Sequence, residues 1–545
     1  MAGAAGATGA ASLLSGKHAF AQKPVKGDPG GTTKPPPTTT TPTVNPGTIA
    51  NPTPFIEPLP IPAVLQPVAS LSPAPIPSKH QLYSQYVPKK FYEVHVKEGM
   101  HSFHPALPPQ KIFGYNGVTP GYTIKARYGE PILTRFFNEL PPDYVGIGVP
   151  QISPHLHNLH GAPESDGNPV NFFDPGYFWD NHYPMFPFNN DSRNALGTLW
   201  CHDHRFDFTA QNVYKGLAFF YLCYDALDSG TEVASTTYPN SLRLPSGEFD
   251  VPLMISDRKF DSNGNLVYDT FNLDGMLGDK YTVNGKIQPF FKVARRKYRF
   301  RLLVANPSRF YRFFLSNGDP FTVIGNDGNL LPAPIQMQSI YLGVAERADI
   351  IIDFSKYPIG TEIILENRLE QEDGRGPTGD LLNPGTPLLK FIVDRDVASD
   401  PSQVPATLRP LPPLPSNTEI NALRTRHWKF DRSNGAWTVN GEFFDPDVVR
   451  AQVKRGTKEV WVLENGGGGW HHPIHIHHNE FRILSRNGVK PPPFEQGRKD
   501  VVTLEPGEEV RVLMEFSAFL GKYPIHCHNT VHEDHAMMVL WEIVP

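Results

Sequence analysis

Cysteine is scarce in this sequence, which has only three among its 545 residues: Cys201, Cys223 and Cys527. Such a small number excludes the disulfide framework on which many small secreted domains depend. Cys201 and Cys223 both lie in apolar runs typical of strands, so we expect them to be buried as small hydrophobic side chains. A bridge between these two is the alternative in an oxidising compartment.

Net charge and long apolar runs are also limited. The formal net charge of -5 gives no reason to expect nucleic acid or an anionic membrane surface as a partner. No apolar run reaches the roughly 18–20 residues that cross a bilayer, so we expect no membrane span. No long segment repeats its apolar residues with the helical period of about 3.6, so helices should be short connectors.

Proline and glycine, in contrast, are abundant, with 57 and 46 residues, and 39% of the chain is hydrophobic. The apolar segments are short and several alternate with polar residues, as in residues 122–128 and 298–304. Short alternating runs separated by turn residues are typical of the strands of sandwiches and barrels. We therefore predict an all-β protein, and its length suggests about three domains.

The first 84 residues differ in composition from the rest. Residues 1–22 are rich in alanine and glycine and end in Ala19-Phe20-Ala21, which resembles the second half of a secretory signal. We expect a twin-arginine type signal whose start lies upstream, and hence a secreted, periplasmic or cell-surface protein. A disordered tail with a chance Ala-x-Ala is the alternative. Residues 23–84 are rich in Pro, Thr and Ser and predict a disordered linker or a wrapping arm.

Three strand-rich blocks follow this N-terminal region. We place them at residues 85–228, 229–410 and 411–545, with a proline-rich connector at 396–416. Each block has the length of an ordinary domain. The sequence therefore predicts three β domains in a row.

The densest group of reactive side chains lies in the last strand and the loop after it. On a strand, His526 and His528 project from one face and Cys527 from the other. His532 and Met537 follow Cys527 by 5 and 10 residues. One Cys, two His and a weak axial Met are the ligands of a blue-copper electron-transfer site, so one more His must come from elsewhere.

Three further His-x-His pairs occur upstream, and each projects two imidazoles from one face if it lies on a strand. Four pairs supply eight imidazoles, enough for a cluster of three copper ions, and His472 remains to complete the site at Cys527. A structural zinc site closes with four ligands and favours several Cys, so copper fits better. The twelve candidate ligands are His155, His157, His202, His204, His472, His475, His477, His526, Cys527, His528, His532 and Met537.

The spacing of these pairs repeats along the chain. His155 lies 47 residues before His202, and His475 lies 51 residues before His526. The first and last blocks therefore look like copies of one unit, whereas the middle block contains no histidine and would be a copy without metal. Since neither outer block alone supplies eight imidazoles, the sequence predicts a cluster shared between the first and third domains.

With these motifs, nearly the whole chain after residue 85 resembles the multicopper oxidases. The most specific motifs are His472-Pro473-Ile474-His475-Ile476-His477 and His526-Cys527-His528. Residues 91–117, Ser165-Asp166-Gly167 and His532-Glu533-Asp534 look most like the bacterial spore-coat laccase and bilirubin oxidase branch. The resemblance implies three cupredoxin-like Greek-key β-sandwich or barrel domains, four copper ions, and oxidation of a small electron donor coupled to reduction of O2 to water.

By the same resemblance, each candidate ligand has a place. His472, Cys527 and His532 would bind the type 1 copper with Met537 as the axial ligand. His155 and His475 would bind the type 2 copper. The type 3 pair would be held by His157, His202, His204, His477, His526 and His528. Electrons from the substrate would pass through Cys527 to His526 or His528.

Two acids and one departure from the family pattern complete the site. Glu533 and Asp166 match family acids that deliver protons to oxygen, and the alternative for each is a structural carboxylate that bonds a ligand His.

The first motif of the family is usually His-x-His-Gly, whereas Asn158 follows His157 here and a Gly follows His160. A frame that uses His157 and His160 is therefore open, although a spacing of three does not place both on one strand face.

The resemblance implies a laccase-like enzyme that acts on phenols, aromatic amines or bilirubin-type pigments. A metal oxidase for Mn(II) or Cu(I) is the second hypothesis, and a non-catalytic copper-binding coat protein is the third. The chain has only nine Met, and none cluster apart from Met537-Met538, which disfavours a dedicated cuprous oxidase. The complete ligand set disfavours a carrier, which needs no three-copper cluster. The glycine-rich loop at 466–469, before His472, is a candidate for shaping the substrate entrance.

Overall fold

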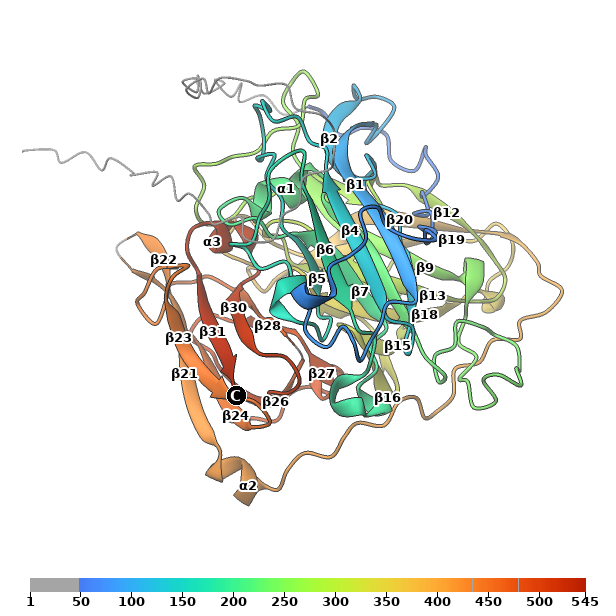
Figure 1. Cartoon of the computed structure of the whole chain (residues 1–545). Coiled ribbons are helices and arrows are strands. Elements are labelled where there is room, and N and C mark those ends of the chain that lie inside the picture. The colour runs from blue at the N-terminus through green and yellow to red at the C-terminus, as the bar shows by residue number, and fades with distance from the viewer. Residues whose placement is uncertain (1–48, 434, 479) are drawn as a thin grey trace, which may run out of the picture.

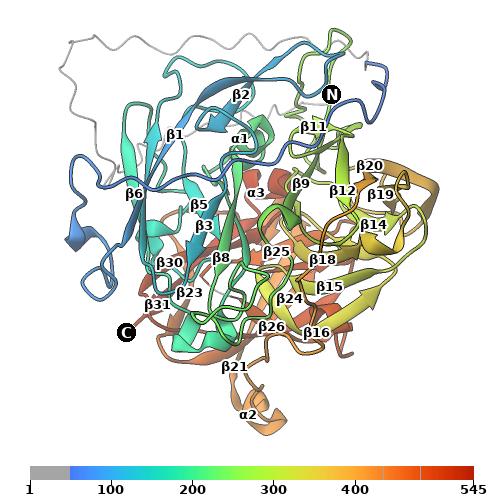
Figure 2. The same cartoon turned by 90° about the vertical axis from the view of Figure 1, so that its right-hand side faces the viewer.

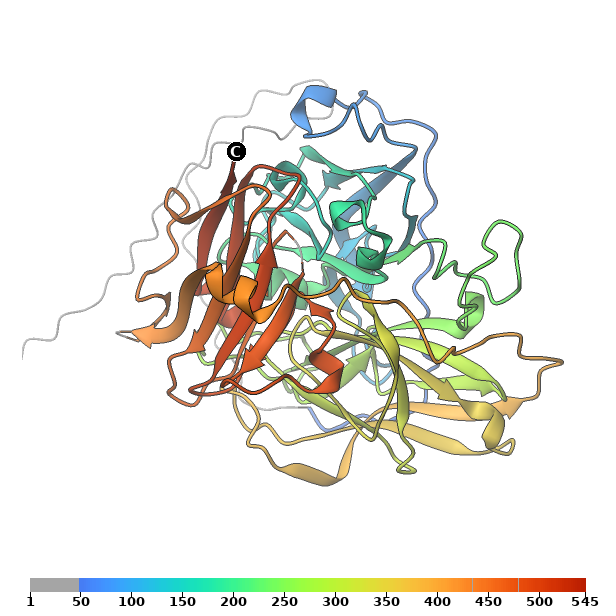
Figure 3. The same cartoon turned by 90° about the horizontal axis from the view of Figure 1, so that it is seen from below.

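The computed structural model describes residues 49–433, 435–478 and 480–545 (Figure 1). Within these ranges the chain forms six β-sheets, and its α-helices are short: α1 (Thr209–Lys215), α2 (Asn417–Ala422) and α3 (Thr530–Asp534). The sheets pair around three large hydrophobic cores, which gives three cupredoxin-like domains grouped around a common centre (Figure 3). The prediction of an all-β, three-domain protein is confirmed.

The first domain packs a sheet of order β2-β1-β4-β6 against one of order β3-β8-β7-β5. Alternation along β1 buries Tyr92, Val94 and Val96, which share a core with Leu199 and Phe219 of the opposite sheet. The strands are β1 (Lys90–His101), β2 (Gln110–Tyr115), β3 (Ile124–Arg127), β4 (Ile132–Asn138), β5 (Pro154–His157), β6 (Phe178–Tyr183), β7 (Thr198–Asp203) and β8 (Ala218–Tyr224).

The middle domain packs a sheet of order β11-β10-β9-β13-β18-β15-β16 against one of order β12-β20-β19-β14-β17. Phe300 and Ile350 of the first sheet meet Phe313 and Phe391 of the second in its core. The strands are β9 (Asp250–Arg258), β10 (Lys280–Val283), β11 (Lys286–Ile287), β12 (Phe290–Ala294), β13 (Lys297–Val304), β14 (Tyr311–Leu315), β15 (Phe321–Asn326), β16 (Asn329–Met337), β17 (Ile340–Leu342), β18 (Arg347–Asp353), β19 (Glu362–Leu369) and β20 (Leu381–Arg395).

The third domain packs a sheet of order β22-β21-β24-β29-β26-β27 against one of order β23-β31-β30-β25-β28. Its core contains Trp461 and Trp541, and also Cys527 and Met537. The strands are β21 (Arg424–Ser433), β22 (Ala436–Val439), β23 (Val449–Lys454), β24 (Lys458–Asn465), β25 (His472–Ile476), β26 (Phe481–Arg486), β27 (Arg498–Lys499), β28 (Val501–Leu504), β29 (Glu509–Glu515), β30 (Gly521–Cys527) and β31 (Met538–Val544).

The three domains repeat the same strand pairing. In one sheet of each, the first strand pairs in parallel with a later one: β1 with β4, β9 with β13, and β21 with β24. In the other sheet, β3 pairs with β8, β12 with β20, and β23 with β31, again in parallel. Consequently β5, β14 and β25 are equivalent strands, and so are β7, β19 and β30.

Residues 49–84 wrap along the outside of the first and middle domains (Figure 2). Their backbone bonds to both domains, with Leu59 N donating to Phe290 O at 2.7 Å and Leu65 N donating to Thr123 O at 2.9 Å. Gln81 also ties the arm to the third domain, because its Oε1 accepts from Leu520 N at 3.0 Å. Of the two predictions for residues 23–84, the wrapping arm therefore holds from residue 49 onward. The predicted signal segment, residues 1–22, lies outside the described residues.

Short 3-10 turns connect several strands. They are η1 (Pro77–Lys79), η2 (Pro163–Ser165), η3 (Phe188–Asn190), η4 (Ser192–Asn194), η5 (Gly247–Phe249), η6 (Phe354–Lys356) and η7 (Pro493–Glu495). Among the described residues, no helix is both long and apolar enough to span a membrane.

Candidate metal centre

The four His-x-His pairs converge where the first and third domains meet. They are His155 and His157 on β5, His202 and His204 at the end of β7, His475 and His477 at the end of β25, and His526 and His528 at the end of β30. His155 faces His202 across β5 and β7, and His475 faces His526 across β25 and β30. In the middle domain, the equivalent strands β14 and β19 pair Phe313 with Asn367, so they offer no imidazole there.

His204, His477 and His526 direct their Nε2 atoms to one point. These atoms lie 3.1 Å apart for His204 and His477, 3.2 Å for His204 and His526, and 3.1 Å for His477 and His526. Two further triplets have candidate ligand atoms within 4.8 Å of one another. They are His157 with His202 and His528, and His155 with His157 and His475. The eight imidazoles therefore form one buried cluster.

Several ring nitrogens in this cluster have no hydrogen-bond partner although they are buried. They are His155 Nε2, His157 Nδ1, His202 Nε2, His204 Nδ1, His475 Nε2 and both nitrogens of His528. Each unpartnered buried polar atom costs about 1–3 kcal/mol, so seven in one place require a common explanation. A metal ion would take the lone pair of one nitrogen on each ring, and the residues therefore fit a cluster of bound metals.

The opposite ring nitrogens bond to protein oxygens, which is how metal-binding imidazoles are usually oriented. Asp166 accepts hydrogen bonds from two of these imidazoles, one in the first domain and one in the third. Its carbonyl accepts from His155 Nδ1, and its Oδ2 accepts from His477 Nδ1 at 2.8 Å. Asp166 is buried, and burial raises the pKa of its carboxyl well above the ordinary value.

Asp500 has the reciprocal role on the other side of the cluster. Its carbonyl accepts from His475 Nδ1 at 2.7 Å, and its Oδ1 accepts from His157 Nε2 at 2.8 Å. Asp166 and Asp500 thus each bond one His of their own domain through the main chain and one His of the other domain through the side chain. Asp500 is a site residue that no sequence motif indicated. Its only local signal is a charged pair, Lys499-Asp500, before an apolar run, which an exposed turn would produce equally well.

Glu533 lies on α3, and its carboxylate is 98% buried beside the cluster. Its two oxygens face His204 Nδ1 and His526 Nδ1 at ion-pair distances. Asp203, between two candidate ligands, points away from the cluster and accepts from Ser153 N at 2.7 Å. The structure therefore places Glu533 and Asp166 beside the imidazoles, whereas Asp203 has a structural role.

Cys527 and two imidazoles form a second group on the other face of β30. The Sγ atom lies 3.5 Å from His472 Nδ1 and 3.6 Å from His532 Nδ1, and these two nitrogens are 3.2 Å apart. The outer nitrogen of His532 donates to Asp274 O at 2.9 Å. Met537 lies in the same core as Cys527, and its carbonyl accepts from Cys527 N at 3.1 Å. One thiol and two imidazoles in contact are the donor set of a blue-copper site.

Burial sets the protonation of these groups. It lowers the pKa of His202 and His472 to about 3, so their imidazoles are neutral and offer a free lone pair. It raises the pKa of the Cys527 thiol well above its usual range. The thiol therefore keeps its proton until a metal ion displaces it, and metal binding must release protons.

Three other residues from the sequence analysis lie apart from both groups. His160 packs against Phe188 and His478, with ring centroids 4.8 and 4.6 Å away, and it belongs to none of the triplets above. Cys201 and Cys223 are buried free thiols, as expected for small hydrophobic side chains. The alternative, a bridge between them, is absent from the structure.

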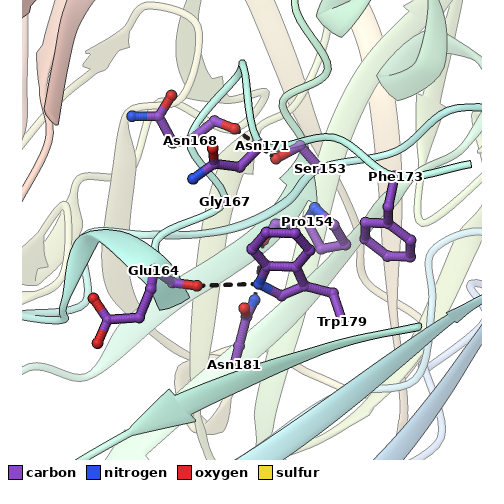
Figure 4. Close-up of a pocket in the computed structure, with 9 residues that line it drawn as sticks. All are labelled: Ser153, Pro154, Glu164, Gly167, Asn168, Asn171, Phe173, Trp179 and Asn181. Atoms are coloured by element: carbon purple, nitrogen blue, oxygen red, sulfur yellow. Dashed lines mark hydrogen bonds between the residues drawn. The ribbon is translucent and has the colours of Figure 1, made fainter. Parts of the chain in front are cut away.

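A narrow crevice reaches the backbone beside Asp166 (Figure 4). Gly167 has a φ of +74°, and a Cβ atom there would lie 2.3 Å from Pro154 O, so only glycine fits. Trp179 Nε1 donates to Glu164 O at 3.0 Å on the opposite wall. This close packing of the loop against β5 fixes Asp166 next to His155. The crevice is lined by Ser153, Pro154, Glu164, Gly167, Asn168, Asn171, Phe173, Trp179 and Asn181.

Comparison with known proteins points to one family. The family described as multicopper oxidase matches residues 255–374 and again residues 412–545. The chain is 36% identical to a bilirubin oxidase of Albifimbria verrucaria over 500 residues, which cover 89% of this chain and 80% of that protein. It is 33% identical to a laccase of Bacillus subtilis (strain 168), over 89% of this chain and 97% of the relative. The crystal structure of a laccase from Pediococcus acidilactici superposes with a TM-score of 0.75 and 27% identity, over 92% of this chain and 95% of that chain.

Proposed function

This chain belongs to the multicopper oxidase family, and we propose that it is a laccase-like enzyme that oxidises small aromatic donors and reduces O2 to water. The proposal rests on three consecutive residues at the end of β30, which are His526, Cys527 and His528. Cys527 belongs to the thiol-imidazole group, and its chain neighbours His526 and His528 belong to two different imidazole triplets. A few covalent bonds therefore connect the two groups.

Membership of this family implies copper binding, and we assign four copper ions. His472, Cys527 and His532 would hold the type 1 ion, with Met537 as the axial ligand. His155 and His475 would hold the type 2 ion. The type 3 pair would lie in the triplets His157-His202-His528 and His204-His477-His526. The unpartnered buried nitrogens and the outer hydrogen bonds of these imidazoles support this assignment.

Copper at these positions supplies one-electron chemistry and the site at which O2 is reduced. The chain itself provides orientation and protons. Oxygen reduction consumes protons, and we assign their delivery to Glu533 and Asp166, two of the carboxyl groups that touch the imidazoles from outside. The raised pKa of Asp166 favours its protonated form, which is the form that can donate.

Aromatic and cationic side chains surround the thiol-imidazole group. The Trp437 ring lies 3.8 Å from the His532 ring, and Trp470 lies 5.3 Å from Trp437. The guanidinium groups of Arg375 and Arg432 lie 5.0 and 5.2 Å from the Trp470 ring. The rings favour an aromatic donor that can stack on them, such as a phenol, an aromatic amine or a bilirubin-type pigment, while Asp274 and Asp373 balance the charges of the two arginines.

Oxygen uptake tests the proposal. Copper-loaded protein should consume O2 rapidly with a methoxyphenol and slowly with Mn(II) or Cu(I) as the donor. Uptake with Mn(II) or Cu(I) alone would replace the proposal by a metal oxidase. No uptake with any of these donors would leave a copper-binding protein without turnover.

We further propose domain boundaries at residues 85–228, 229–410 and 411–545, with the three-copper cluster between the first and third domains. The Ala-x-Ala pattern within residues 1–22 supports export to the cell surface, the periplasm or the medium. N-terminal sequencing of protein recovered from cell fractions tests this, because export predicts a mature chain that starts after Ala21.

A further inference from the structure

A buried arginine of the middle domain contacts Asp500. Arg347 lies on β18, is fully buried, and donates through Nη1 to Asp500 Oδ1 at 2.8 Å and through Nη2 to Oδ2 at 2.5 Å. Such a two-pronged pair fixes both the position and the plane of a carboxylate. The same Oδ1 accepts from His157 Nε2, so the arginine is one residue removed from the imidazole cluster.

Arg347 connects all three domains at this point. Its Nε donates to Thr198 O on β7 of the first domain at 3.3 Å, and Nη1 also donates to Ala345 O of the middle domain at 3.0 Å. The main chain of Asp500 is held as well, because its N–H donates to Asp327 Oδ2 at 3.0 Å. Lys499 neutralises the charge of Asp327, because its Nζ lies 3.1 Å from Asp327 Oδ2.

Asp500, held in this way, orients two imidazoles. The rings of His157 and His475 stack with centroids 3.8 Å apart, and Asp500 accepts the outer N–H of both. This arrangement leaves His157 Nδ1 and His475 Nε2 buried and without a partner. Asp166, which has the reciprocal position, forms an ion pair with no arginine or lysine among the described residues.

We propose that Asp500 is a positioning residue of the imidazole cluster and that Arg347 holds it, so that the domain without ligands determines how firmly the cluster binds copper. The inference rests on the proposed function. Outer partners of metal-binding imidazoles typically contribute about 10- to 100-fold to metal affinity. The blue site should be independent, because neither residue is among its hydrogen-bonding partners.

Two variants and one matched control test the inference. Arg347→Lys keeps the charge but cannot form both bonds, and Asp500→Asn keeps the shape but loses the charge. Arg301→Lys is the control. It breaks an equally buried two-pronged pair with Asp250 in the same domain, with bonds of 2.7 and 2.7 Å, and neither residue contacts a candidate ligand. Each protein is loaded with copper and titrated with a chelator. The copper retained by each protein, measured by metal analysis, and the blue absorption are followed.

Both test variants should release the copper of the imidazole cluster at chelator concentrations about 10- to 100-fold lower than the wild type, with the blue absorption unchanged. The control should behave as the wild type. The inference is overturned if Arg347→Lys and Asp500→Asn release copper as the control does, or if the copper of the cluster and the blue absorption are lost together. If Arg347→Lys does not fold, Asp500→Asn decides alone. A wild-type chain that retains no copper beyond the blue site would instead refute the proposed function.

Discussion

The carboxylate of Glu533 lies between two imidazoles from different domains, with Oε1 3.1 Å from His204 Nδ1 and Oε2 3.0 Å from His526 Nδ1. His204 follows β7 of the first domain, and His526 lies on β30 of the third. The side chain is 2% exposed, so bulk water does not reach it freely. This position is suited to passing a proton toward the cluster while it holds the two rings.

Glu533→Gln should therefore slow the reduction of O2 without slowing the oxidation of the donor. The amide keeps the shape but cannot give up a proton, and loss of a proton donor typically slows a reaction by about 10²- to 10⁴-fold. Turnover should fall by that factor. Stopped-flow measurements should show unchanged anaerobic bleaching of the blue absorption by the donor and slow recovery when O2 is added. Slow bleaching with normal recovery would place Glu533 on the electron-entry side instead.

Cys527→Ser should abolish the blue absorption and the oxidation of phenols. A hydroxyl cannot replace the thiolate as a soft ligand, and it breaks the link from His472 and His532 to the cluster. Visible spectra and oxygen uptake are the measurements. Cys223→Ala, which truncates another fully buried free thiol, is the control and should keep both properties. A blue, active Cys527→Ser variant would refute the ligand assignment.

Substitutions at two nearby histidines decide between the two frames of the first motif. His155→Gln should weaken copper binding by at least about 10- to 100-fold, because that imidazole points an unpartnered nitrogen into the cluster. His160→Gln should keep the full copper content, since His160 packs against Phe188 and His478 instead. Metal analysis after dialysis against a chelator measures both. The opposite ranking would support the frame that uses His157 and His160.

Lys215→Met should stabilise the folded protein at neutral pH. Lys215 ends α1, is 6% exposed, and burial lowers the pKa of its amine from 10.5 to about 8. Below pH 8 the folded chain must carry a buried charge that the unfolded chain exposes to water. The penalty is therefore complete there, shrinks as the pH rises from 8 to 10.5, and vanishes above that range.

The gain from Lys215→Met should reach about 3 kcal/mol below pH 8, judged from the size of the pKa change. Calorimetric melting of the variant and the wild type at pH 7 and at alkaline pH measures it, and the two melting temperatures should converge at the alkaline pH. The amine also donates to Lys111 O at 2.6 Å. A variant that is less stable at every pH would mean that this bond outweighs the buried charge.

Local patterns were sufficient to predict the architecture of this protein. Alternation predicts which side chains of β1 face the core, and the period of two explains why Cys527 points away from His526 and His528. The similar spacing of the outer His-x-His pairs predicts the repeated unit, and the equivalent pairing of β5 with β7 and of β25 with β30 agrees with it. These features follow from neighbours in sequence, and short-range geometry is the same wherever a strand occurs.

Local patterns predict the strand class, the repeat and the set of candidate metal-binding side chains, because a His-x-His pair on a strand places both rings on one face in any context. The surroundings of these side chains depend on how the whole chain folds. His157 and Asp500 lie 343 residues apart, and no local pattern relates them to each other or to Arg347 of the middle domain. Residues 49–84 become an ordered arm for the same reason: their backbone bonds lie on distant strands, which only the folded domains bring within reach.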